Sequence, residues 1–108
     1  MASEQNMMAT EKVAGAAETK MGSHDITGSF ETALNSVPRG KPGTRLWKLI
    51  RLVQAHEDDV VAAFPTEDEA VAWIIDLYNR AIAPKMPDVL DAGARLLIET
   101  LVRALYPG

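Results

Sequence analysis

Apolar residues recur at helical spacing from residue 44 onward, and this pattern predicts a first amphipathic helix over residues 44–64. Its core side is formed by apolar residues that cluster on one side of the helical wheel: Leu46, Leu49, Ile50, Val53, Val60 and Phe64. Thr44 follows Pro42-Gly43 and is the expected N-cap. Pro65 ends the helix, because the residue before a proline is pushed out of the α conformation.

Two further helices are predicted by the same periodicity. Thr66, with Glu69 three residues later, forms a capping box that opens a helix ending at Pro84. The next helix starts near Asp88 and runs to about Tyr106. Short links that contain proline favour antiparallel neighbours, and no segment alternates with the period of a strand. The sequence therefore predicts an all-α fold, a small three-helix bundle over residues 44–108.

Residues 1–43 have a different composition, rich in Ala, Glu, Thr, Ser, Gly and Met and poor in large apolar groups. Such a segment buries too little surface to offset its conformational entropy. We therefore expect a disordered N-terminal tail that ends in a basic hinge, with transient helical turns near TEKVAGAAETK or SFETALNSV. The length of 108 residues allows one domain.

The second and third predicted helices carry apolar residues over about 200° of their circumference, more than the usual stripe of about 100°. A bundle of some 65 residues has little interior to cover both. We therefore expect a protein-protein interaction module that self-associates as a homo-oligomer, in an adaptor, regulatory or assembly setting. The predicted interface anchors are Trp73, Leu77 and Tyr78, with Trp47 and Leu52 on the first helix. The alternative is that one of these helices is central and buried on all sides.

Charge is unevenly distributed in this chain of net charge −4. Residues 32–56 contain no carboxylate and carry five cations: Arg39, Lys41, Arg45, Lys48 and Arg51. On the predicted helix, the last three of these cations share one arc on the solvent side, beside Leu52 and Trp47. This tract could contact nucleic acid or another polyanion, an acidic protein or, as a less favoured hypothesis, an anionic membrane surface through RLWKLIRLV.

Just upstream, Pro38-Arg39-Gly40-Lys41-Pro42-Gly43 resembles the AT-hook, a short DNA-binding segment with a Pro-Arg-Gly-Arg-Pro core. The resemblance implies that Arg39-Gly40-Lys41 would lie along the minor groove of A/T-rich DNA. It covers six residues and departs from the family where Lys41 replaces an arginine. Nucleic-acid binding through residues 39–51 is therefore the alternative function. A solvated hinge between tail and bundle is the structural alternative for the same six residues.

No catalytic constellation is present in the sequence, and we expect no enzyme activity, cofactor or metal site. Cysteine is absent, which excludes thiolate ligands and nucleophiles. Ser23, His24 and Asp25 are adjacent in sequence and cannot converge as a triad. His56-Glu57 lacks the second histidine of a zincin helix.

The N-terminal residues and the apolar runs predict a cytoplasmic protein. The first twenty residues lack the cationic and apolar regions of a secretory signal, and their glutamates argue against a transit peptide. No apolar run approaches the ~20 residues needed to span a bilayer.

Overall fold

A computed structural model describes residues 22–107 of the chain, and this part is helical throughout without a strand. The all-α class is confirmed, but the count of three helices is wrong. Residues 22–107 form five α-helices and one 3₁₀ turn: α1 (Ser23–Asn35), α2 (Pro42–Ala55), α3 (Glu57–Ala63), α4 (Glu67–Ala81), η1 (Ala83–Lys85) and α5 (Asp88–Arg103). The expectation for residues 1–21 lies outside the described residues.

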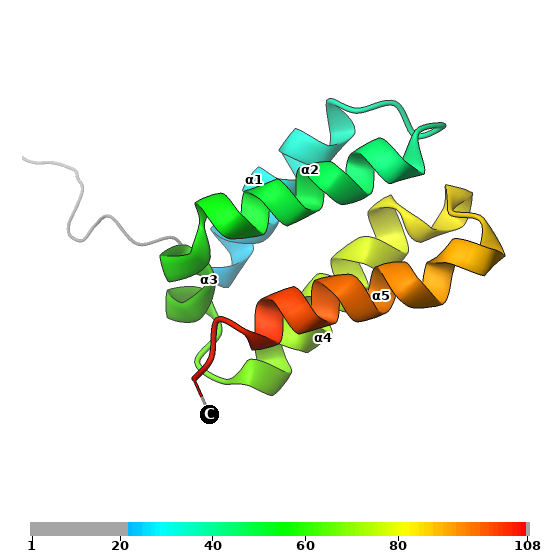
Figure 1. The fold of residues 1–108 in the computed structure, drawn as a ribbon. Helices are drawn as coiled ribbons and strands as arrows, with labels where there is room; N and C mark the ends of the chain where they lie inside the picture. The colour runs from blue at the N-terminus through cyan, green and yellow to red at the C-terminus, as the bar shows by residue number, and fades with distance from the viewer. Residues whose placement is uncertain (1–21, 108) are drawn as a thin grey trace, which may run out of the picture.

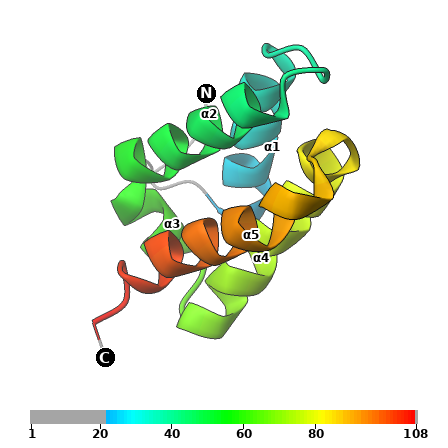
Figure 2. The same ribbon diagram turned by 45° about the vertical axis from the view of Figure 1, so that its right-hand side comes forward.

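The helices are arranged as two hairpins packed on each other (Figure 1). Helix α1 packs on α2, α3 and α4, while α5 packs on α4 and α2. In both views α2 and α5 lie on one side of the molecule, with α1 and α4 behind them (Figure 2). The short helix α3 turns the chain from the first hairpin into the second.

Helix α1 lies within the segment that we expected to be a tail, and it is part of the core. Ile26, Phe30 and Leu34 are fully buried at positions i, i+4 and i+8. The packed structure therefore already includes residues 22–43, in contrast to the predicted boundary at residue 44. Three large apolar residues on one helix face are enough to dock α1, because α4 supplies a complementary apolar surface.

The predicted helix over residues 44–64 is broken at His56, which separates α2 from α3. The backbone of His56 has φ −128° and ψ 34°, outside the helical region. The ring of His56 lies 5.8 Å from that of Phe30, and its Nδ1 is 3.1 Å from Asp59 Oδ2. The chain therefore changes direction while Val60 and Phe64 stay buried.

Helix starts and ends agree in part with the sequence. The Thr66 hydroxyl accepts a hydrogen bond of 3.2 Å from the Glu69 N–H, so the predicted cap of α4 is confirmed. The N-cap predicted at Thr44 is wrong, because α2 starts with Pro42 in its first turn. Proline fits there since the first N–H groups of a helix have no intrahelical partner.

Candidate interaction surface

The outer side of α5 carries most of the exposed large apolar side chains among the described residues. Among these residues six large apolar side chains are exposed, and four of them lie on α5: Val89, Leu90, Leu96 and Leu97. Val89 is 89% exposed and Leu96 is 65% exposed. The opposite side of the helix packs in the core through Ala94, Ile98 and Val102. We call the exposed set, together with Gly93, the α5 apolar face.

The α5 apolar face is continuous and contains no charged residue. At about 100° per residue, its members and Thr100 occupy an arc of about 120° on α5, and they extend over about 16 Å along the axis. The acidic and basic side chains of α5 lie outside this arc, and four of them form ion pairs along the helix. Asp91 pairs with Arg95 and Glu99 with Arg103, both at 2.9 Å. The apolar face is therefore free of the charges that usually keep a surface helix solvated.

A groove with a volume of about 310 Å³ runs between α5 and the first turns of α2. Its walls are Gly43 and Leu46 on α2 and four members of the apolar face on α5: Val89, Leu90, Gly93 and Leu97. Trp47 follows Leu46 on α2 and is 65% exposed, as expected for an interface anchor. The apolar surface therefore reaches from α5 across to α2.

Three of the predicted interface anchors lie in the core instead of on the surface. Leu77 and Tyr78 are fully buried and Trp73 is 9% exposed. The indole N–H of Trp73 donates to Thr27 Oγ1 at 2.8 Å, and its ring stacks on Phe64 at 4.7 Å. The prediction failed here because α1, which was not expected to fold, covers this side of α4.

Leu52 was predicted to be exposed beside the cations, and this placement is also wrong. Its side chain is half-buried and packs against the core. Of the five predicted anchors, Trp47 is therefore the one that is exposed at the surface. None of the four exposed residues of α5 was named as an interface anchor from the sequence, although the wide apolar spread of this helix did indicate an interface there. An arc without charges was the signal that could have selected them.

Tyr78 fixes the position of α5 on α4. Its hydroxyl donates to Asp91 Oδ1 at 2.8 Å, and the Arg95 guanidinium lies 5.1 Å from the centre of its ring. Burial raises the pKa of Tyr78 to about 12, and the bond to Asp91 and its charge add to this effect. The hydrogen bonds from Arg95 and Tyr78 lower the pKa of Asp91. These contacts keep one side of α5 against the bundle and leave the apolar face outward.

Arg45 was predicted to share an exposed basic surface with Lys48 and Arg51, but it is buried. It is 2% exposed and donates from Nη1 to the Ala81 carbonyl at 2.7 Å and from Nε to the Val37 carbonyl at 2.9 Å. A longer bond of 3.5 Å joins Nη2 to Asn35 Oδ1. Burial, and then repulsion from Arg39, lower the pKa of Arg45. Its predicted contact with a polyanion is therefore wrong, and its role is structural.

Lys48 and Arg51 remain at the surface and lie beside Trp47. Together with Val37 and Thr44, these three residues line a shallow groove with a volume of about 490 Å³. Arg51 is exposed and Lys48 is half-buried. An exposed indole between two cations is a small surface suited to an anionic, stacking ligand.

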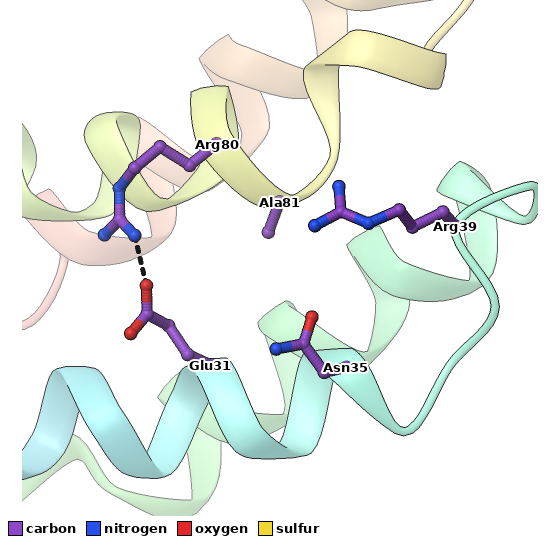
Figure 3. Close-up of a pocket in the computed structure, with 5 residues that line it drawn as sticks. All are labelled: Glu31, Asn35, Arg39, Arg80 and Ala81. Carbon is purple, nitrogen blue, oxygen red and sulfur yellow. Dashed lines mark hydrogen bonds and ion pairs between the residues drawn. The ribbon is translucent and has the colours of Figure 1, made fainter.

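The AT-hook-like segment forms an exposed turn that leads into α2. The Lys41 N–H donates to the Pro38 carbonyl at 3.0 Å, which closes a turn, and Pro42 and Gly43 belong to α2. Arg39 extends over a small pocket of about 90 Å³ between α1 and α4 (Figure 3). Across this pocket Arg80 forms an ion pair with Glu31. The six residues are therefore a turn and a helix start, whereas a hook along a DNA groove is extended.

Within residues 22–107, no three His, Asp or Glu side chains are grouped so that they could hold a metal ion. His24 and Asp25 are exposed, and His56 is half-buried beside Asp59. Among the helices that the structure describes, none has the length and apolar character to cross a bilayer.

Comparison of the chain with models of protein families, with curated proteins and with solved structures gives no match.

Proposed function

We propose that the chain is a non-enzymatic protein-protein interaction module that associates with a second copy through the α5 apolar face. The observation that carries this proposal is the continuous uncharged arc with Val89, Leu90, Leu96 and Leu97 exposed. Contiguous exposed apolar surface of this kind marks interaction sites on proteins of this size. An adaptor, a regulator or an assembly component, acting in the cytoplasm, is the setting that we expect from the sequence.

The available area is sufficient for a weak to moderate dimer. The four large side chains and Trp47 expose on the order of 600 Å² of apolar surface, from typical side-chain areas. Two copies that cover each other would bury about 1,200 Å², the lower end of the range for specific interfaces. We therefore expect an association that depends on protein concentration.

The test compares Leu96→Lys with Ala72→Lys by sedimentation equilibrium and light scattering. Leu96 is 65% exposed on the apolar face, whereas Ala72 is exposed on α4, away from it. We expect the mass of the wild-type chain to rise from one copy toward two between low micromolar and near-millimolar concentration. Ala72→Lys should behave in the same way, and Leu96→Lys should keep the mass of one copy. A wild-type mass of one copy over the whole range would refute self-association.

A second candidate is binding of nucleic acid or another polyanion, and it is favoured by the cluster of Trp47, Lys48 and Arg51. This surface is distinct from the α5 apolar face and is smaller than the sequence suggested. Arg45 is buried, and the AT-hook-like residues are folded. The two candidates therefore make separate predictions for variants of α2 and of α5.

A further inference from the structure

Gly93 lies on the midline of the α5 apolar face and is not explained by the packing of a single copy. A Cβ atom added at Gly93 would meet no atom within 4 Å. Glycine inside a helix is less favourable than alanine, because it loses more backbone entropy on folding. Unlike Gly28, which has the same free space on α1, Gly93 lies among the exposed large side chains of the apolar face, where the absence of a side chain leaves room for another backbone to come close.

The large residues of the apolar face form two rows beside this midline. At 100° per residue, Val89 and Leu96 lie on one side of Gly93, and Leu90 and Leu97 lie on the other. Thr100, two turns after Gly93, continues the midline with a second small side chain. Two rows of large side chains with small residues between them form a furrow that can receive another helix at short distance.

We infer that the occupant of this furrow is α5 of a second copy, packed antiparallel about a two-fold axis near residues 96 and 97. The inference rests on the proposed self-association and adds its orientation and register. In this arrangement Leu96 faces Leu97 of the second copy, and Gly93 faces Thr100 of the second copy. The same surface serves both copies, as an isologous interface requires.

Charge favours the antiparallel orientation over the parallel one. Helix α5 begins with Asp88 and Asp91 in its first turn and ends with Arg103. Antiparallel packing places the acidic end of each helix near the basic end of the other and also opposes the two helix dipoles. Parallel packing would bring Asp88 toward Asp88 and Arg103 toward Arg103. Within one copy Asp91 is paired with Arg95, and Arg103 with Glu99 and Glu67. The electrostatic preference for antiparallel packing therefore rests mainly on Asp88 and on the helix dipoles.

The first experiment measures distances between spin labels in the full chain. The protein has no cysteine, so Lys85→Cys and Ala92→Cys each carry one label, at exposed sites outside the apolar face. Residue 85 precedes α5, far from the two-fold axis, whereas residue 92 lies near that axis, so antiparallel packing predicts a clearly longer separation at residue 85 than at residue 92. Nearly equal separations in a dimer would overturn the orientation and leave the proposed function intact. A chain that stays monomeric would refute both.

The second experiment compares Gly93→Ala with Gly28→Ala. Gly28 is also an exposed helical glycine with no atom within 4 Å of an added Cβ, but it lies on α1. Both variants should unfold at slightly higher urea than the wild type, since both remove the same backbone penalty. Only Gly93→Ala should weaken dimerisation, by about tenfold, because the methyl group separates the two helices. Equal dimerisation of the two variants would overturn the close approach at Gly93.

Discussion

At the scale of single residues, Arg45 shows how a buried charge is accommodated without a carboxylate among its described hydrogen-bond partners. Its guanidinium donates to the carbonyl of Ala81, the last residue of α4, and contacts the side chain of Asn35, the last residue of α1. The last carbonyls of a helix have no intrahelical partner and carry partial negative charge. Arg45 therefore joins the C-terminal ends of two helices to a third.

We predict that Arg45→Met destabilises the fold by about 2–4 kcal/mol, because the carbonyls of Ala81 and Val37 lose their donor while the space stays filled. The measurement is urea unfolding at low protein concentration. Arg51→Met is the matched control on the exposed side of α2, with an expected change within about 0.5 kcal/mol. Equal stability of the two variants would show that Arg45 is not structural.

The sequence could not place Arg45 correctly because its partners lie on other elements. Helical periodicity grouped it with Lys48 and Arg51, and those two residues do remain accessible. The carbonyls that bind Arg45 belong to segments eight and 36 residues away. A pattern along α2 contains no information about where the ends of α1 and α4 lie.

At the scale of elements, the starts and ends set by proline and capping residues could be predicted, while the packing partners of each helix could not. Two predictions of this kind are correct: the cap of α4 at Thr66, and an apolar surface on α5 wider than the core can cover. It missed α1, whose apolar stripe is only Ile26, Phe30 and Leu34 within a polar segment that also contains Gly28. That omission then misplaced Trp73, since α1 is the element that covers it.

Phe30 tests whether α1 belongs to the cooperative core. It is fully buried, and its ring lies 5.3 Å from that of Trp73. We predict that Phe30→Ala lowers the free energy of unfolding by about 3–5 kcal/mol, because it removes packing and leaves a cavity. Phe30→Leu, the control that keeps most of the volume, should cost less than about 1.5 kcal/mol. The measurement is urea unfolding followed by Trp73 fluorescence. Both variants and their reference protein carry Trp47→Phe, so that Trp73 is the only tryptophan. An unchanged midpoint for Phe30→Ala would mean that α1 is not docked in solution.

At the scale of the whole molecule, apolar and basic surfaces lie on neighbouring parts of the same side. The α5 apolar face continues across the groove to Leu46, and the next residue, Trp47, lines the second groove with Lys48 and Arg51. Trp47 therefore borders both surfaces. A chain with a net charge of −4 presents this basic strip against an acidic background, so long-range attraction to a polyanion is limited.

We predict that A/T-rich duplex DNA binds weakly, only at low ionic strength and without preference over G/C-rich duplex. Few cations remain accessible near Trp47, and phosphate contacts of this kind are screened by salt and carry no sequence information. Titration followed by Trp47 fluorescence should show loss of this binding in the double variant Lys48→Gln/Arg51→Gln and no change in Leu96→Gln, which alters the α5 apolar face without adding a charge. A preference for A/T-rich duplex that persists at physiological salt and disappears in Arg39→Gln would instead support the AT-hook hypothesis. Such a result would require the turn from Pro38 to Lys41 to open, because the hydrogen bond between these two residues holds Arg39 over the bundle.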